Sequence, residues 1–362
     1  MSTPRALITG VTGQDGSYLA EIMLNRGYEV HGVVRRSSSF NTARVERLIE
    51  EKPDFHWHFG DLTDGASLRR LLEKTNPSVV YNLGAQSHVR VSFDVPEYTA
   101  DTVAMGTLRL LEAIKDVNKS IRFYQASSSE MFGGKNCPPG GFHEESRFDP
   151  QSPYAVAKVF AYNMTRHYRE AHGLFACNGI LFNHESPRRG ETFVTRKITR
   201  AVARIVAGKQ KNLELGNIDA IRDWGHAWDY ARAMVMMMHN TDTPSDYVVA
   251  SGETHSVRGF LEAAFSLVGL DWEKYVIPNC TRYFRPTEVF YLLGNSGKIR
   301  HDLGWNPLYT FKDLVHGMVY HDCRQEGLDV PKSQQCPVPR PYLTPEKQFA
   351  LTRESLFPKE KP

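Results

Sequence analysis

Tyr154 and Lys158 stand four residues apart in a segment with the features of a helix, so their side chains share one helical face. An ammonium group beside a phenol favours the phenolate. The spacing therefore predicts that Lys158 lowers the pKa of Tyr154 from its usual value of about 10. A phenol tuned in this way can act as a base near neutral pH. By itself the pair could also be two surface residues, so its meaning depends on its neighbours.

Residues 127–130 (SSSE) follow a predicted strand and add two groups that could take part in the same chemistry. The hydroxyl of Ser128 can hydrogen-bond the substrate oxygen that Tyr154 deprotonates. Glu130 is a candidate for a second acid or base. A simple dehydrogenase or 4-epimerase needs only one proton-transfer group. A carboxylate in addition to the phenol therefore indicates a second proton transfer. The alternative for Glu130 is a solvated or helix-capping side chain.

Three glycines, Gly10, Gly13 and Gly16, come directly after a predicted strand and open a helix. Glycines permit a tight turn and a close backbone approach, and the free N–H groups of a helix N-terminus attract phosphate. This predicts a dinucleotide cradle that also includes Thr12, Gln14, Asp15. An ordinary strand-to-helix turn is the alternative.

Residues at the ends of the next strands extend this cofactor site. The second strand ends in Arg35 with no carboxylate, which favours NADP over NAD because arginine accommodates a 2′-phosphate. A solvated basic loop is the alternative. We expect Asp61 and Leu62 at the adenine. The nicotinamide side is predicted to include the residues after the fourth strand: Leu83, Gly84, Ala85, Gln86, Ser87.

Short apolar runs alternate with amphipathic stretches through the first half of the chain, which predicts a Rossmann-type, doubly wound parallel α/β sheet. The expected strands are residues 6–9, 29–34, 55–59, 79–83, 122–126 and 175–182. The expected helices are residues 17–26, 66–74, 104–117 and 153–172. The last helix has Ser152 as a cap, Pro153 in its first turn and Gly173 after its end.

The alternation fades after Asn183, which predicts a smaller α+β substrate domain. Its expected helices are residues 195–207, 257–268 and 298–303, with a short strand at 212–216 and a turn-rich stretch at 279–285. We therefore predict a cofactor domain over 1–183 and a mainly substrate-binding domain over 184–330. The chain is expected to return to the first domain around 220–255 and 285–300. Residues 331–362 are expected to form a poorly ordered tail.

Composition narrows the class of protein. The 362 residues carry 44 Lys and Arg against 41 Asp and Glu, a formal charge of +3, which argues against a nucleic-acid-binding surface. The longest apolar run, residues 233–238, is too short to cross a membrane. Five scattered cysteines without metal-ligand spacing predict no metal site and no disulfide framework. Together with the absence of a signal-peptide pattern, this favours a cytoplasmic enzyme.

Several long motifs are similar to the GDP-mannose 4,6-dehydratase family, over residues 5–325. They are GVTGQDGSYLAE from Gly10, YNLGAQSHV from Tyr81, EYTADTVAMGTLRLLEAI from Glu97, ASSSEMFG from Ala126, SPYAVAK from Ser152, FNHESPRRGETFVTRKI from Phe182, LGNIDAIRDWGHAWDY from Leu215 and YFRPTEV from Tyr283. The resemblance implies an extended short-chain dehydrogenase/reductase fold, bound NADP and GDP-mannose as substrate.

The resemblance also implies an internal redox cycle. Tyr154 takes the proton of the C4 hydroxyl while hydride leaves C4, and Glu130 removes the C5 proton. Water leaves, and hydride returns to C6 to give GDP-4-dehydro-6-deoxy-mannose. Ser128 binds the C4 oxygen, and Lys158 holds the cofactor ribose and tunes Tyr154.

The family pattern adds further contacts. The implied cofactor residues are Tyr98, His184 and Arg189, and the implied substrate residues are Ser87, Ser128, Glu130, Asn183, Val194, Lys197, Leu215, Gly216, Arg222, Arg285, Glu288. Among these, Arg222, Arg285 and Lys197 suit a diphosphate, because guanidinium and ammonium groups bind phosphate oxygens. Taken singly, each could instead form a surface salt bridge.

The sequence departs from the family pattern at two places: Ser128 replaces the usual threonine, and residues 290–295 lack the usual acidic residues. One alternative is a dTDP-glucose 4,6-dehydratase or a 4-epimerase, but the former typically has Asp-Glu where this chain has Ser129-Glu130, and the latter lacks the glutamate. A non-catalytic NADP-binding sensor is the other, although the tyrosine and lysine are both present. The family also implies a homo-oligomer, a dimer or tetramer, with residues 35–42 at the interface.

Overall fold

The computed structural model describes residues 3–328, and the predicted tail over 331–362 lies outside them. Its main element is a seven-stranded parallel sheet in the order β10-β6-β5-β4-β1-β2-β3. The prediction of a doubly wound α/β fold is confirmed. The strands are β1 (Arg5–Thr9), β2 (Glu29–Val34), β3 (Phe55–Phe59), β4 (Val79–Asn82), β5 (Arg122–Ser128), β6 (Ala176–Leu181) and β10 (Tyr247–Val249).

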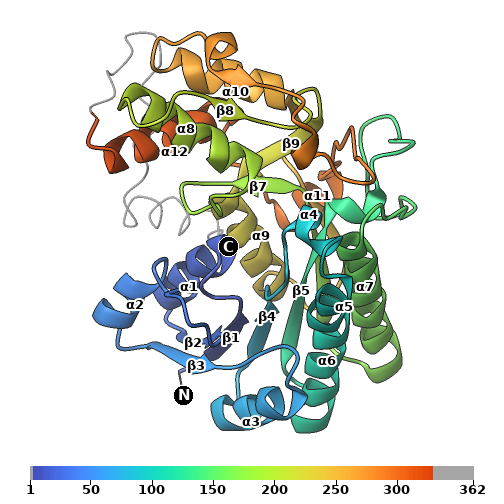
Figure 1. The fold of residues 1–362 in the computed structure, drawn as a ribbon. Coiled ribbons are helices and arrows are strands. Elements are labelled where there is room, and N and C mark those ends of the chain that lie inside the picture. The colour runs from blue at the N-terminus through green and yellow to red at the C-terminus, as the bar shows by residue number, and fades with distance from the viewer. Residues whose placement is uncertain (1–2, 329–362) are drawn as a thin grey trace, which may run out of the picture.

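Helices cover both faces of this sheet (Figure 1). One face packs against α1 (Gln14–Asn25), α2 (Glu46–Glu51), α9 (Ala227–His239) and α11 (Gly297–Leu303). The other packs against α3 (Gly65–Thr75), α6 (Gly106–Val117) and α7 (Pro153–His172). Short helices α4 (Val89–Ser92), α5 (Pro96–Ala100), the π-helix η1 (Asp101–Met105) and the 3₁₀ helix η2 (Ser129–Phe132) connect these layers.

A second group of elements lies at the top of Figure 1, above the sheet. It holds a three-stranded sheet of β7 (Asn183–Glu185), β9 (Ile221–His226) and β11 (Thr254–Ser256), and a two-stranded sheet of β8 (Leu213–Glu214) and β12 (Val276–Ile277). Its helices are α8 (Val194–Val206), α10 (Val257–Ser266), α12 (Phe311–Gln325) and the 3₁₀ helices η3 (Trp272–Lys274) and η4 (Thr281–Tyr283). Apolar side chains of α8, α10 and α12 form its core.

The predicted ends of a helix agree best with the structure where capping residues mark those ends. Ser152 accepts the N–H of Ala155 at 3.1 Å, and Gly173 ends α7 with a φ of 69°. The predicted helix over 104–117 instead begins as the π-helix η1 and becomes α-helical at Gly106. Helix α1 begins three residues before the expected Ser17, because Gly13 stands at its cap.

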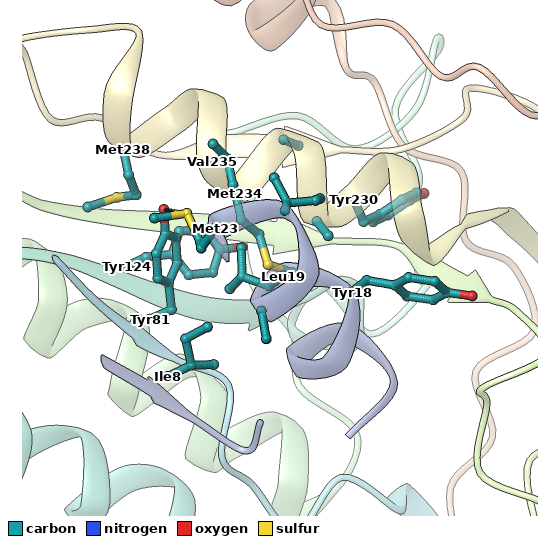
Figure 2. Packing of buried hydrophobic residues seen from close by; sticks show 14 of the residues in the cluster. Ile8, Tyr18, Leu19, Met23, Tyr81, Tyr124, Tyr230, Met234, Val235 and Met238 are labelled. Carbon is teal, nitrogen blue, oxygen red and sulfur yellow. Dashed lines mark hydrogen bonds between the residues drawn. The ribbon is translucent and has the colours of Figure 1, made fainter. Parts of the chain in front are cut away.

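Helix α9 is present in the structure although the sequence did not predict a helix there. Its residues 233–238 are buried on every side, so no amphipathic period marks the segment as a helix. Figure 2 shows Met234 and Val235 of α9 packed against Leu19 and Met23 of α1. After this helix the chain adds β10 beside β6, with Tyr247 opposite Gly179. Residues far apart in the sequence therefore complete the sheet.

No helix within residues 3–328 has the length and apolar character needed to span a bilayer.

His226 joins β9 to α9 and is held as a neutral imidazole. Its Nδ1 accepts the N–H of Trp228 at 3.1 Å, which requires an unprotonated nitrogen. The ring is 1% exposed and stacks on Tyr309. Burial, together with the positive charges of Arg188 and His184, lowers its pKa to about 3. Protonation would remove the cap of α9.

We therefore expect acid to destabilise the fold through His226. Its pKa is lower in the folded chain than the unfolded value of about 6.5, so its contribution is present above that pH and is lost as the pH falls toward 3. This predicts a loss of up to about 3 kcal/mol in unfolding free energy by pH 4. In His226→Asn, which keeps a capping acceptor, the acid-induced loss should be smaller in urea titrations at pH 7.5 and 4.5. The exposed His301→Asn is the control, and equal losses in wild type and His226→Asn would contradict the prediction.

Candidate active site

A cleft of about 870 Å³ opens where the strands β1, β4, β5 and β6 end, between the sheet and the second group of elements. All predicted substrate residues line it, whether they come from β5, α8, β9 or the loop after η4. The lining also includes these predicted cofactor residues: Gly10, Gly13, Gln14, Asp15, Gly16, Leu83, Ala85, Ser87, Tyr154, Lys158, His184, Arg189.

The other predicted cofactor residues lie outside the lining of this cleft: Thr12, Arg35, Asp61, Leu62, Gly84, Gln86, Tyr98. Two of them, Arg35 and Tyr98, are hydrogen-bonded to each other through the guanidinium and the phenol. Asp61 accepts two hydrogen bonds from Thr63 and thereby shapes the turn after β3. Leu62 is buried in the core of the sheet.

The glycine turn has little room for side chains. Gly10 has a φ of +68°, and a Cβ there would lie 2.9 Å from the backbone nitrogen of Gly84. A Cβ on Gly16 would lie 2.3 Å from the carbonyl oxygen of Gly10. Gly13 leaves the N-terminus of α1 without a side-chain cap. The turn therefore exposes backbone N–H groups and lets a phosphate approach closely, as a dinucleotide requires.

Buried His184 and partly exposed Asp15 form a pair beside this turn. The Nε2 of His184 lies 2.8 Å from Asp15, and its Nδ1 lies 2.6 Å from the carbonyl oxygen of Phe182. Because neither acceptor carries a hydrogen, both ring nitrogens must donate, so His184 is an imidazolium. Burial alone would lower the pKa of His184, but the carboxylate of Asp15 raises it above its usual value. The imidazolium thus neutralises the one carboxylate in the first turn of α1.

Ser128, Tyr154 and Lys158 meet at the floor of the cleft. Ser128 ends β5 and hydrogen-bonds the phenol of Tyr154, which stands in the first turn of α7. The Nζ of Lys158 donates to the carbonyl oxygen of Ala126 at 2.6 Å and lies 5.7 Å from the centroid of the Tyr154 ring. All three are buried. The alternative of a surface pair is therefore wrong.

The predicted lowering of the Tyr154 pKa is wrong for this structure. Burial raises the pKa of Tyr154 to about 12, and this outweighs the hydrogen bond from Ser128. Burial also lowers the pKa of Lys158 to about 8, which reduces the charge available to favour a phenolate. Spacing along a helix predicts proximity, but not the loss of solvation that here decides the sign of the shift.

Glu130 also faces the cleft and is 8% exposed. Its carboxylate oxygens lie 3.3 and 3.5 Å from Nη1 of Arg285. The capping role in η2 belongs instead to Ser128, whose hydroxyl accepts the N–H of Glu130 at 3.3 Å. Glu130 is therefore neither solvated nor a helix cap. It is a buried carboxylate in the same cleft as the phenol.

Two other cations line the cleft but already have partners. The guanidinium of Arg222 donates to the carbonyl oxygens of Ile221 at 2.8 Å and Val289 at 2.7 Å. Burial lowers its pKa to about 10, while Glu130 raises it. The Nζ of Lys197 donates to the carbonyl oxygen of Glu214 at 2.7 Å. These contacts fix positive charge along the cleft, and the alternative of surface salt bridges does not hold for either residue.

Sequence reasoning missed several lining residues, including Arg44, His88, Trp224, Tyr283. Arg44 donates to the carbonyl oxygens of Arg188 at 2.6 Å and Thr12 at 3.3 Å, so it braces the glycine turn. It lies in a loop where no motif marks it. Trp224 and Tyr283 stand within motifs similar to the family, and this was the available signal for them.

The fold is shared with solved nucleotide-sugar enzymes. The structure resembles dTDP-glucose 4,6-dehydratase from Bacillus anthracis in complex with NAD, with a TM-score of 0.78 and 22% identity over 90% of this chain and 98% of that one. It also resembles Thermus thermophilus UDP-glucose 4-epimerase complexed with NAD, with a TM-score of 0.76 and 24% identity over 88% and 98% of the two chains. The fold is thus the Rossmann type that these dehydratase and epimerase structures share.

Closer relatives identify the family. The family model for GDP-mannose 4,6 dehydratase matches residues 7–318. GDP-mannose 4,6 dehydratase 1 of Arabidopsis thaliana is 51% identical over 95% of both chains. The human GDP-mannose 4,6 dehydratase is 50% identical over 89% of this chain and 92% of its own. This chain belongs to the GDP-mannose 4,6-dehydratase family.

Proposed function

We propose that this chain dehydrates GDP-α-D-mannose to GDP-4-dehydro-6-deoxy-α-D-mannose with bound NADP. The observation that carries the proposal is the buried Glu130 carboxylate in one cleft with Ser128, Tyr154 and Lys158. A cleft with the phenol alone suits oxidation or epimerisation at one carbon. A second acid or base suits the removal of an additional proton before water is eliminated.

The glycine turn at Gly10, Gly13 and Gly16 would hold the cofactor pyrophosphate, and the fit is supported by the space that a Cβ there would fill. His184 neutralises the Asp15 carboxylate, which would otherwise repel that pyrophosphate. NADP⁺, when bound, supplies a hydride acceptor and donor and a cationic ring that favours the phenolate form of Tyr154.

The protein residues move two protons. Tyr154 takes the proton of the C4 hydroxyl, while Ser128, already hydrogen-bonded to this phenol, holds the C4 oxygen. Lys158 holds the ribose and braces the site through its hydrogen bond to Ala126. Glu130 then removes the C5 proton, which the C4 carbonyl has made acidic, and gives this proton to the C6 hydroxyl, which leaves as water.

The opposite wall of the cleft is proposed to bind GDP. Arg222, Arg285 and Lys197 supply positive charge for the diphosphate, and all three line the cleft. Asn183, Val194, Leu215, Gly216 and Glu288 complete the proposed contacts.

The direct test is incubation of the purified protein with a panel of nucleotide sugars, followed by mass spectrometry. GDP-mannose should lose one water, with no net consumption of NADP. An oxidised product with stoichiometric NADPH would refute the internal return of hydride. Loss of water only from dTDP-glucose, or inversion at C4 without loss of water, would favour another dehydratase or an epimerase. Binding of cofactor without turnover of any sugar would favour a sensor.

The proposed preference for NADP over NAD depends on Arg35, which directly follows the end of β2. Its guanidinium donates a hydrogen bond to the phenol of Tyr98. In Arg35→Asp we expect NADP affinity to fall about tenfold and NAD affinity to rise, because a carboxylate repels a 2′-phosphate and accepts from a 2′-hydroxyl. Calorimetric titration with both dinucleotides measures this, with the neighbouring Arg36→Asp as control. An unchanged ratio of affinities would contradict the assignment.

The protein is also proposed to form a homo-oligomer. The loop 35–42 carries Phe40, which is 70% exposed and suits burial against a second copy. A molecular mass of a monomer in light scattering would refute the homo-oligomer.

The last part of the proposal is a cytoplasmic location. The cytoplasmic location is supported by the free state of the described cysteines: Cys137, Cys177, Cys280, Cys323.

A further inference from the structure

The ion pair between Glu130 and Arg285 joins two residues that the proposed function assigns to different partners. Nη1 of Arg285 lies 3.3 Å from one carboxylate oxygen of Glu130 and 3.5 Å from the other. Glu130 is proposed to accept a proton from C5 of the sugar, whereas Arg285 is proposed to bind the diphosphate. A carboxylate whose two oxygens face a guanidinium has fewer lone pairs free to accept another proton, because the guanidinium N–H groups occupy them.

Arg285 is the partner that can move. It lies in the loop after η4, and its backbone N–H is fixed by Glu288 at 2.8 Å, which leaves the side chain free to turn. Within residues 3–328, the hydrogen bonds of its guanidinium are those to Glu130. These distances exceed the 2.7–2.9 Å typical of charge-assisted hydrogen bonds, so the contact is easily exchanged. Its side chain is 25% exposed to the cleft.

Arg222 provides the contrast. Its guanidinium is held by the carbonyl oxygens of Ile221 and Val289, and the residue is only 8% exposed, with Glu130 close enough to interact with its charge. It therefore remains in place when a ligand enters. If Arg285 turned away, Glu130 would still have the fixed positive charge of Arg222 near it, so its charge would not be left uncompensated in a buried site.

We propose that Arg285 is a substrate-responsive positioning residue, which pairs with Glu130 in the empty cleft and leaves it for the diphosphate when a nucleoside diphosphate sugar binds. This inference rests on the proposed function. A diphosphate carries more negative charge than one carboxylate, so it competes well for the guanidinium. Glu130 is thereby released as a base only when a substrate occupies the cleft.

A double-mutant cycle on GDP binding tests the competition directly. Calorimetry would compare the full-length wild type, Glu130→Gln, Arg285→Gln and the double variant. We expect Glu130→Gln to bind GDP about fivefold more tightly than wild type, because glutamine does not compete for the guanidinium. Arg285→Gln should bind GDP about tenfold more weakly. In the Arg285→Gln background, Glu130→Gln should have no further effect.

Controls separate this competition from a general effect of charge. Glu191 also lines the cleft and is largely exposed, so Glu191→Gln should change GDP affinity less than twofold. Guanosine, which lacks phosphates, should bind wild type and Glu130→Gln equally. Arg285→Met removes the charge but keeps a long side chain, and it gives the same cycle if Arg285→Gln does not fold.

The inference is overturned if Glu130→Gln leaves GDP affinity unchanged, weakens it, or changes it equally in both backgrounds. The outcome of this binding experiment can be distinguished from the outcome of the test of the proposed function. A cycle with the expected coupling in a protein that does not dehydrate GDP-mannose would contradict the proposed reaction alone. Turnover of GDP-mannose without coupling would contradict the role of Arg285 alone.

Discussion

Tyr154→Phe should lower the kcat for GDP-mannose by about 10³-fold, the effect expected when a general base is removed. The variant keeps the aromatic ring that packs in α7 but loses the hydroxyl that contacts Ser128. Because the first proton transfer is lost, we expect no reduced nicotinamide in a single turnover. Mass spectrometry of the sugar and absorbance of the cofactor would measure both effects.

The control for this prediction is a second tyrosine of the same helix. The phenol of Tyr168 donates to Glu112 on the outer side of the sheet, outside the lining of the cleft. Tyr168→Phe should therefore keep its activity within about twofold, while it loses some stability. A Tyr154→Phe variant with kcat near that of Tyr168→Phe would show that another group accepts the C4 proton.

Glu130→Gln should also lower kcat, by about 10²- to 10⁴-fold, but at a later step. Oxidation at C4 depends on Tyr154 and proceeds, whereas removal of the C5 proton lacks its base. We therefore expect reduced nicotinamide to accumulate, at up to one per active site. In deuterated solvent, recovered sugar should carry no deuterium at C5. Substrate binding should remain, and the inferred competition with Arg285 predicts that it becomes tighter.

Exposed Glu145 provides a matched control, because Glu145→Gln removes a carboxylate from the surface instead of the cleft. It should turn over like wild type. If Glu130→Gln accumulated no reduced cofactor and lost activity as Tyr154→Phe does, Glu130 would act before C4 oxidation. Near-normal turnover would remove Glu130 from the mechanism altogether.

His184 and His226 are neighbours in space but differ in protonation state, so the residue type alone does not give the charge of a histidine. His184 donates from both nitrogens and is an imidazolium, whereas His226 accepts at Nδ1 and is neutral. Both are buried, and they lie on paired strands, His184 in the middle of β7 and His226 at the end of β9. Nothing in their local sequence separates them. The difference comes from Asp15, which is far away in the chain and close in space.

Local signals predicted the cofactor half of the fold. Glycines in a strand-to-helix turn, Ser152 as a helix cap and alternating apolar runs are effects of nearest neighbours, so they can be seen without tertiary structure. Helix α9 and strand β10 show no local pattern, because partners distant in the sequence bury them: α1 packs on α9, and β6 pairs with β10. Helix α12 was missed too, despite the capping box of Thr310 and Asp313.

By itself, the sequence determined which groups could carry out the chemistry. They are a hydroxyl and a carboxylate at or just after the end of a strand of the parallel sheet, and a phenol and an ammonium in the first two turns of a helix. These identities follow from local spacing, and the fold confirms that they share one cleft. Only the tertiary structure decided their electrostatic state. Burial raises the pKa of Tyr154 to about 12, and Arg285 neutralises Glu130. Solvation and ion pairing depend on atoms brought together from distant parts of the chain, so no local pattern encodes them.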